Sequence, residues 1–178
     1  MSTTTDVTRT HNTPIGPLRL SASDAGITRV RFPRSRTVVP DTHRDDGAER
    51  ARQWLDQAAR ELDEYFAGTR TRFDVPVDLG RVDGERRTVL EALADGVGHG
   101  ETTTYGTLAA ATGLTGDGAR RVGVAMARNP VPILIACHRV IGADGSLTGY
   151  AGGLQAKRLL LEHERGVTSL HHGVPQPR

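Results

Sequence analysis

Cysteine is almost absent from this 178-residue sequence, which contains only Cys137. A single cysteine excludes an internal disulfide and any zinc site built from several thiolates, so we expect no metal. The sequence also lacks an apolar run of membrane-spanning length. Its start, MSTTTDVTRTHNTP, has no apolar segment of the kind that a signal peptide requires. Since a lone free thiol survives most easily in a reducing compartment, we expect a soluble, cytoplasmic protein.

Excess charge of either sign is missing as well, because the formal net charge is only +2. The distribution of charge is less even: residues 101–178 carry eight Lys and Arg against five Asp and Glu, and residues 118–143 hold four arginines and no acid. A local cationic patch on a nearly neutral protein is what contact with phosphate requires. An ordinary solvated face would show the same charges, so charge alone does not decide.

The first half of the chain has the patterns of a small α+β unit. Alternating apolar residues indicate strands, and apolar residues at three- and four-residue spacing, including Trp54 and Tyr65, indicate one long amphipathic helix that Gly68 ends. We expect disorder at 1–12, strands at 15–20, 27–32 and 70–79, a loop at 33–47 and a helix at 48–66. The stripe on this helix is typical of core packing, and the unit, residues 13–80, shows no chemistry of its own.

The second half, residues 84–166, reads as mainly helical. Apolar spacing and terminal glycines predict helices at 85–94, 105–111, 118–128 and 155–165, followed by a disordered tail at 167–178. The two middle helices are joined by a turn that contains glycine, which fits a helix-turn-helix, and Arg120, Arg121 and Arg128 lie on the second of them. Many helical hairpins never touch DNA, so this pattern by itself is weak.

The cysteine lies in the most informative stretch, NPVPILIACHRVIGADGSLTGY at 129–150. The apolar run 131–135 contains a proline, which excludes a continuous helix and predicts a buried, extended segment. After the cysteine, Asp144 and Gly145 mark a hairpin-like turn. A nucleophilic thiol needs a neighbouring base, and His138 follows it directly. The alternative is a buried cysteine that acts only as a small hydrophobe.

The whole stretch resembles the methylated-DNA–protein-cysteine methyltransferases, suicide repair proteins that remove alkyl groups from oxygen-6 of guanine. The resemblance extends through GYAGGL at 149–154 and Lys157 to LLEHE at 160–164. It implies a small N-terminal sheet-plus-helix (ribonuclease H-like) domain followed by a mainly helical, winged helix-turn-helix-like active-site domain, an α+β fold. Three departures stand out: Ala136 replaces the family proline, Leu90 replaces a tryptophan, and Pro-Phe-Gln is missing near Glu85.

The resemblance also implies the chemical roles of the site residues. His138, acting through a water, takes the proton of Cys137, and Glu164 orients the imidazole. Glu164 could instead be a solvated charge, but a carboxylate is electrostatically misplaced at the end of a helix. The acceptor is the protein itself, so no cofactor is needed and each molecule acts once.

Base recognition follows from the same resemblance, since the lesion must be flipped out of the duplex. Tyr105 contacts the 3′ phosphate and the base, and Arg120 fills the space left in the stack, with Arg121 and Arg128 as further DNA contacts. Asn129 fixes the turn before the cysteine by side-chain bonds to backbone. The predicted substrate pocket consists of Met126, Val140, Tyr150, Ala151 and Lys157.

The expected function is therefore single-turnover transfer of a methyl or other alkyl group to Cys137 from guanine oxygen-6 in double-stranded DNA, with oxygen-4 of thymine left open. We expect a monomer with no obligate protein partner and no membrane association. The nearest alternative is a non-transferring protein that senses alkylated guanine, although such relatives lack the cysteine. A transcriptional regulator and a cysteine hydrolase are the other two alternatives.

Overall fold

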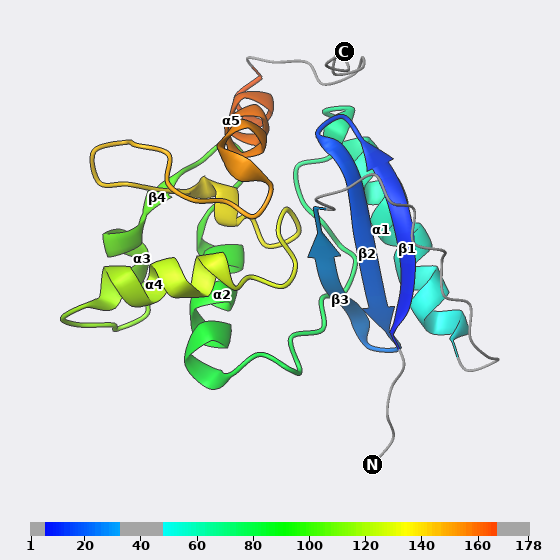
Figure 1. Ribbon diagram of the computed structural model, residues 1–178, viewed down its shortest axis with the longest axis horizontal. Helices are drawn as coiled ribbons and strands as arrows, with labels where there is room; N and C mark the ends of the chain where they lie inside the picture. Colours follow the sequence, from blue (N-terminus) through cyan, green and yellow to red (C-terminus); the bar gives the residue numbers. More distant parts are fainter. Residues whose placement is uncertain (1–5, 33–47, 167–178) are drawn as a thin grey trace.

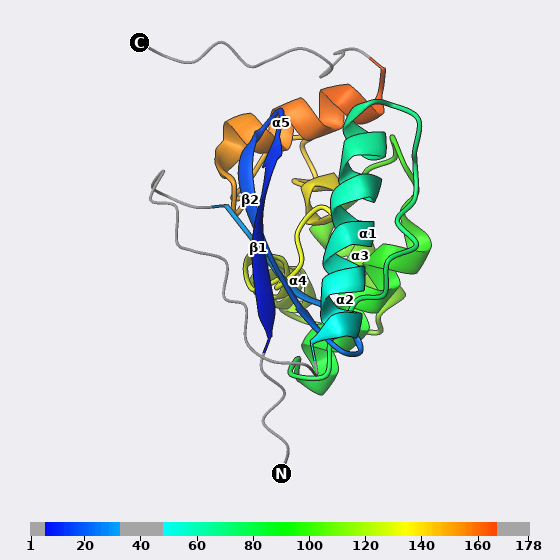
Figure 2. The ribbon, with the colours of Figure 1, turned by 90° about the vertical axis from the view of Figure 1, so that its right-hand side faces the viewer.

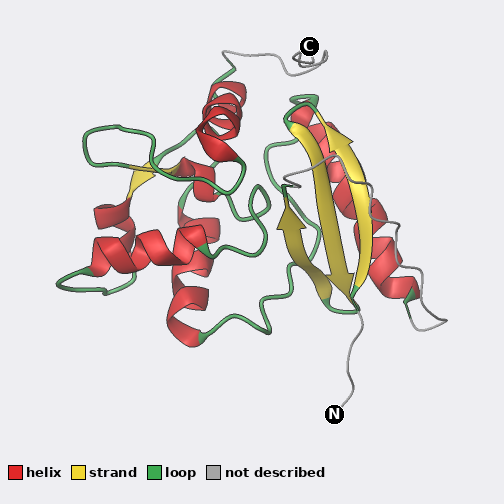
Figure 3. Cartoon of the chain, in the orientation of Figure 1, coloured by secondary structure: helices red, strands yellow, loops and turns green. Residues whose placement is uncertain are grey.

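The computed structural model describes residues 6–32 and 48–166, which form two units side by side (Figure 1). One unit holds a three-stranded sheet and a long helix, and the other holds four helices and a short two-stranded sheet (Figure 3). The expected α+β class is confirmed. Residues 1–5 of the segment predicted to be disordered at 1–12 lie outside the described residues. So do the predicted disordered tail at 167–178 and the predicted loop at 33–47.

The sheet of the first unit is antiparallel in the order β1 (Val7–Thr13), β2 (Gly16–Ser23), β3 (Gly26–Arg31). One face packs against α1 (Glu49–Phe66), as Figure 2 shows. Leu18, Leu20 and Ala22 alternate along β2 and are fully buried. Side chains two residues apart lie on the same face of a strand, so these three residues share one face of β2. The apolar stripe predicted from the sequence is the side of α1 that packs against that face.

Strand β1 corrects the prediction of disorder for residues 7–12. Polar, threonine-rich sequence gives little local signal for a strand, but these residues pair continuously with residues 17–22 of β2. Two of their side chains also reach α1, where Arg9 pairs with Asp56 and His11 Nε2 lies 2.9 Å from Asp63 Oδ1. Partners distant in sequence therefore order the segment.

The predicted strand at 70–79 is also wrong. This segment bends at residues 71, 72 and 75 and makes a single bridge, in which Ile27 N donates to Pro76 O at 2.8 Å and Asp78 N donates to Ile27 O at 2.9 Å. The amides of Asp74 and Val75 instead donate to Oε2 of the buried Glu61. Because a side chain takes these donors and Pro76 has none, a continuous ladder cannot form.

The four helices of the second unit confirm the predicted ones to within two residues at each end. They are α2 (Gly84–Gly96), α3 (Tyr105–Ala111), α4 (Gly118–Ala127) and α5 (Gly153–Glu164). Asp83 caps α2 by accepting from Arg86 N at 3.2 Å, and Thr104 caps α3 by accepting from Thr107 N at 3.1 Å. Helices α3 and α4 pack on each other as a helix-turn-helix, and β4 (Thr103–Thr104) pairs in parallel with β5 (Val140–Ile141).

The segment before the cysteine is buried, as predicted, but it is not an extended strand. Val131, Ile133 and Ile135 are each at most 4% exposed, yet the chain turns, with a bridge between Pro132 and Ile135. Ile133 has φ of 77°, a left-handed conformation that a β-branched residue rarely adopts. Such strain persists only where surrounding contacts impose it. The following residues form the short 3-10 helix Cys137–Arg139.

Candidate active site

Cys137 begins that 3-10 helix and is 5% exposed. Burial raises the pKa of its thiol to about 11, and this effect outweighs the Asn129 side chain and the Lys157 ammonium, which both act to lower the pKa. The thiol is consequently protonated near neutral pH. A buried thiol of this kind reacts only if a base removes its proton as the reaction proceeds.

His138 follows Cys137 in the same 3-10 helix and is the predicted base. Its ring is fully buried, and burial lowers its pKa despite the opposing effect of Glu164, so the imidazole is neutral near pH 7. Nε2 lies 2.7 Å from Glu164 Oε1, and the carboxylate can only accept, so Nε2 carries the proton. Nδ1 is then the acceptor nitrogen, and within the described residues it has no hydrogen-bond partner. The free lone pair is what proton abstraction requires.

Glu164, at the C-terminal end of α5, holds this arrangement together. Arg139 binds it with two nitrogens, Nε to Oε2 at 2.8 Å and Nη2 to Oε1 at 3.0 Å, and Gly100 N donates to Oε2 at 3.1 Å. Tyr65 donates its hydroxyl to Oε1 at 2.8 Å. Burial by itself would raise the pKa of the carboxyl, but the bonds from His138 and Arg139 lower it well below its usual range. The carboxylate therefore stays ionised, although it lies at the unfavourable end of a helix.

Two side chains hold the backbone around the thiol. Asn129 donates Nδ2 to Ile135 O at 2.9 Å and accepts from Val131 N at 3.0 Å, which are the side-chain-to-backbone bonds expected from the sequence. Lys157, the only lysine of the chain, is fully buried and donates Nζ to Val140 O at 2.7 Å and to Thr148 O at 3.0 Å. The ammonium thus ties together the segments before and after the Asp144–Gly145 turn.

Of the other predicted pocket residues, Tyr150 lies next to His138. The Tyr150 ring is 6.3 Å from the His138 ring, and its buried hydroxyl has no partner within the described residues. Tyr105 Oη lies 2.6 Å from Thr148 Oγ1, so α3 is linked to the loop that Lys157 holds. Met126 and Val140 are buried, whereas Ala151 is exposed. Their roles in substrate binding stay predictions.

The three arginines of the predicted recognition helix differ in their surroundings. Arg120 is exposed in the first turn of α4 and forms no ion pair within the described residues, while Arg121 is paired with Glu85 of α2. Arg128 is exposed and, with Asn129, lines a cleft of about 370 Å³. Among the described residues, Arg128 forms no ion pair either, but Arg120 also meets the unfavourable dipole at the N-terminus of α4, which an external anion would offset.

Sequence reasoning missed three groups that contact Glu164. Arg139 stands inside the Cys-His-Arg-Val motif, and its charge within a buried stretch was a usable signal. Gly100 contributes a backbone amide, which no sequence pattern reveals. Tyr65 lies 99 residues from Glu164 and belongs to the apolar stripe of α1, where it looked like an ordinary core residue.

Ala136, which replaces the family proline, has φ of −76° and ψ of 60°. Proline holds φ near −65° within about 15°, and the Ala136 amide donates to no acceptor within the described residues. We therefore expect Ala136→Pro to stabilise the protein by about 0.4–1 kcal/mol, mainly by restricting the unfolded chain. Thermal denaturation should show a rise in Tm of about 1–4 °C, with the rate of alkyl transfer within a few-fold. An increase of that rate by orders of magnitude would instead mark the natural chain as a sensor.

In residues 6–32 and 48–166, no helix combines the length and the apolar character needed to span a membrane. Nor do three or more His, Cys, Asp or Glu side chains gather in that part of the chain in a way that could hold a metal ion.

Comparison with known proteins matches both units to one family. Residues 7–79 match the ribonuclease-like domain of 6-O-methylguanine DNA methyltransferase, and residues 85–166 match its DNA binding domain. The chain is 43% identical over 159 residues to the methylated-DNA–protein-cysteine methyltransferase of Mycobacterium tuberculosis strain H37Rv, covering 88% of this chain and 91% of that protein. It is 39% identical over 153 residues to that of Methanosarcina acetivorans, covering 85% and 93%.

Solved structures agree. The crystal structure of Mycobacterium tuberculosis OGT in complex with DNA superposes with a TM-score of 0.76 at 41% identity, covering 90% of this chain and 93% of that one. The 6-O-methylguanine-DNA methyltransferase from Pyrococcus kodakaraensis, at 22% identity and a TM-score of 0.62, shares the fold.

Proposed function

The chain belongs to the methylated-DNA–protein-cysteine methyltransferase family, and on this basis we propose that Cys137 receives an alkyl group directly from damaged DNA. The protein is a DNA-binding transferase that acts in DNA repair by alkyl transfer. The observation that carries the assignment to Cys137 is the buried Cys137–His138–Glu164 arrangement, with Nδ1 of His138 left as an acceptor.

Proton transfer comes first in the proposed reaction. The neutral imidazole accepts the thiol proton on Nδ1, directly or through a water, and becomes an imidazolium whose second N–H already bonds to Glu164. Since Glu164 keeps its charge, it stabilises the imidazolium without taking the proton. The general base is thus needed because burial alone would leave the thiol protonated.

Alkyl transfer then proceeds by attack of the Cys137 sulfur on the alkyl carbon. The carbon–oxygen bond to guanine breaks, and its electron pair stays on the base, which takes up one proton and becomes ordinary guanine. Tyr105, whose hydroxyl is hydrogen-bonded to Thr148, is the proposed proton donor to the guanine. The sulfur ends as a thioether, with one proton lost by the thiol and one gained by guanine, so each molecule acts once.

The proposed DNA contact uses α4. Arg120 enters the stack in place of the extruded base, with Arg128 and Tyr105 near the backbone, and Met126, Val140, Tyr150 and Ala151 enclose the base. The unpaired charge of Arg120 at the positive end of a helix supports this role, because a phosphate-rich partner supplies the missing anion. Arg121 would have to leave Glu85 to contribute.

The proposal is tested by mass spectrometry of the protein after mixing with a duplex oligonucleotide that contains 6-O-methylguanine. One added methyl group per molecule, located on the peptide that contains Cys137, is the expected result. Repeated turnover, or methylation at another residue, would contradict it. The same mixture with unmodified duplex is the control.

Replacing Arg120 with alanine should lower the rate of repair in duplex DNA by about 10- to 100-fold, because extruding a base costs a few kcal/mol that this side chain offsets. Reaction with free 6-O-benzylguanine should change little, since no base is extruded. Arg50→Ala, an exposed arginine of α1, serves as the matched control. Equal losses on the two substrates would refute the role in base flipping.

A further inference from the structure

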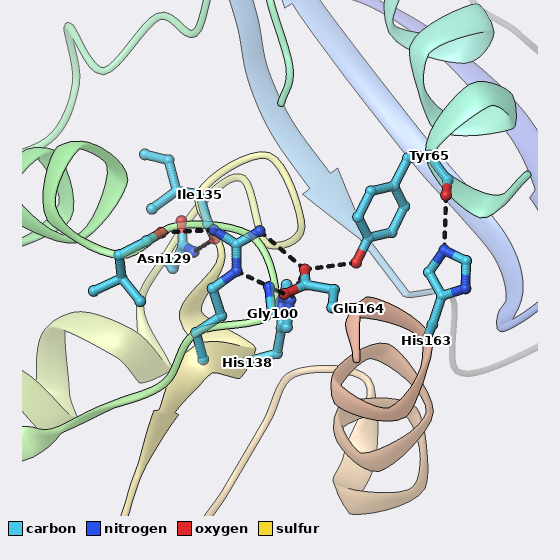
Figure 4. A network of polar contacts seen from close by, with 9 residues as sticks. Tyr65, Gly100, Asn129, Ile135, His138, His163 and Glu164 are labelled. Atoms are coloured by element: carbon cyan, nitrogen blue, oxygen red, sulfur yellow. Dashed lines mark hydrogen bonds and ion pairs between the residues drawn. The ribbon is translucent and has the colours of Figure 1, made fainter. Parts of the chain in front are cut away.

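Tyr65 connects the N-terminal unit to the catalytic carboxylate. Its hydroxyl lies 2.8 Å from Glu164 Oε1, the same oxygen that accepts from His138 Nε2 at 2.7 Å. The side chain is 1% exposed, and Figure 4 shows the phenol entering from α1 opposite Glu164 on α5. A continuous chain of buried hydrogen bonds therefore runs from Tyr65 through Glu164 to the proposed base.

The position of the phenol is set from several sides. His163, the neighbour of Glu164, donates Nε2 to the carbonyl oxygen of Tyr65 at 2.7 Å, and its ring lies 5.2 Å from the Tyr65 ring. Phe73 and His99 pack on the same ring at centroid distances of 5.3 and 5.9 Å. His163 and Glu164, adjacent on α5, thus both bind Tyr65 of α1, and these contacts fix the hydroxyl beside the carboxylate (Figure 4).

Packing does not require the hydroxyl. Phenylalanine would fill nearly the same space, as the buried neighbour Phe66 does at the next position of α1. A buried hydroxyl is costly unless it is bonded, and its partner here is an ion in the proposed proton-transfer path. Burial, reinforced by Glu164, raises the pKa of Tyr65 well above its ordinary value, so the phenol stays protonated and acts only as a donor.

We propose that Tyr65 is a positioning residue for alkyl transfer, through which the N-terminal unit sets the orientation of Glu164 and the basicity of His138. This inference rests on the proposed role of Cys137 and His138. Glu164 accepts five hydrogen bonds, which saturates a carboxylate, and three of them meet at Oε1. Without the phenol, Oε1 keeps its bonds from His138 and Arg139 but loses the one donor from the N-terminal unit, and it carries more of the negative charge.

The effect on His138 has a definite sign. A less dispersed charge on Oε1 attracts the imidazolium more strongly, so loss of the Tyr65 hydroxyl raises the pKa of His138. A smaller fraction of the imidazole is then neutral at acidic pH, and the acidic limb of the rate profile moves to higher pH. The ionisable groups around the pair are Cys137, Arg139, Tyr150, Lys157, His99 and His163, and the substitution leaves all of them in place.

The test measures the second-order rate of Cys137 alkylation against pH, from about pH 5 to about pH 9, for wild type and Tyr65→Phe. Free 6-O-benzylguanine and methylated duplex are both used as substrates. We expect the plateau rate to fall about tenfold and the acidic midpoint to rise by about half a unit to one unit, equally on both substrates. An inactive wild type would refute the proposed function and this role with it, whereas an active wild type with an unshifted Tyr65→Phe midpoint would overturn this role alone.

Phe73→Leu is the matched control, because it disturbs the packing on the Tyr65 ring without touching Glu164. It should lower Tm and leave the acidic midpoint where it is in the wild type. A Tyr65→Phe profile with the wild-type midpoint, whatever its Tm, would reduce Tyr65 to a structural residue.

Should Tyr65→Phe fail to fold, fluorotyrosine at position 65 keeps the volume and the hydrogen bond while making the hydroxyl a stronger donor. The acidic midpoint should then move in the opposite direction, to lower pH. An unchanged midpoint, or a rise, would overturn the proposal.

Discussion

Cys137→Ala will abolish alkyl transfer while leaving the fold and the affinity for DNA intact. The expected loss is at least about 10⁴-fold, because removal of a nucleophile leaves no group to accept the alkyl chain. Only one heavy atom is lost from a site that is 5% exposed, so we expect destabilisation of no more than about 1 kcal/mol. Single-turnover transfer from 6-O-methylguanine duplex, followed by mass spectrometry, measures the effect.

Binding of the same duplex by Cys137→Ala separates chemistry from recognition. The affinity should remain within about threefold of the wild type, since the predicted DNA contacts lie on α3 and α4. Residual transfer by the variant would show that the sulfur of Cys137 is not the acceptor. Loss of binding together with transfer would indicate that the substitution disturbed the whole site.

Glu164→Gln has the second largest expected effect. A neutral amide cannot satisfy five donors, so at least one amide hydrogen opposes a donor such as Arg139 Nε or Gly100 N. The imidazolium of His138 also loses its counter-charge. We expect a fall of about 10²–10⁴ in the rate of transfer, as found when the acid of a comparable triad is neutralised. Reaction with free 6-O-benzylguanine should fall equally, because the defect lies in the chemistry.

The same substitution should cost about 3–5 kcal/mol of unfolding free energy near pH 7, because it leaves the buried guanidinium of Arg139 without an anion. The pKa of Glu164 is depressed in the folded protein, so its contribution is present above its unfolded pKa of about 4.3 and is lost as pH falls below that value. The stability gap between wild type and variant should therefore shrink in acid. Chemical denaturation at several pH values measures it.

Equal stability of the two proteins near pH 7 would contradict the assigned role of the carboxylate. Glu162→Gln, on the same helix but half-buried, is the matched control. It should leave both the rate of transfer and its dependence on pH close to those of the wild type.

Local patterns were enough to predict the five helices. Apolar residues recur along α1 and α4 at helical spacing, and Asp83 and Thr104 cap the helices that follow them. These signals act within one or two turns, so they do not depend on the rest of the chain. The stretch around Cys137 likewise identified the family, because the residues that carry the resemblance follow one another in the sequence.

Segments whose order depends on distant partners were predicted wrongly. β1 forms because β2 offers a full ladder, and residues 70–79 fail to form a strand because Glu61 takes their amides. Before the cysteine, apolar residues and prolines predicted extension, but the chain turns at Ile133 with a positive φ. Composition indicates burial correctly before the cysteine, whereas backbone geometry in all three segments follows from contacts that no short window contains.

The sequence by itself determined the family to which the chain belongs, and it predicted the nucleophile and its neighbouring base. Only the tertiary structure decided how Glu164 is held, since its donors come from α1, from the loop before α3 and from the residues after Cys137. A hydrogen bond between residues 99 positions apart produces no pattern in the sequence, because Tyr65 looks like a core residue and Glu164 like a helix residue when each is considered with its neighbours. The hydrogen bond from Tyr65 to Glu164 thus follows only from the contact between the two units.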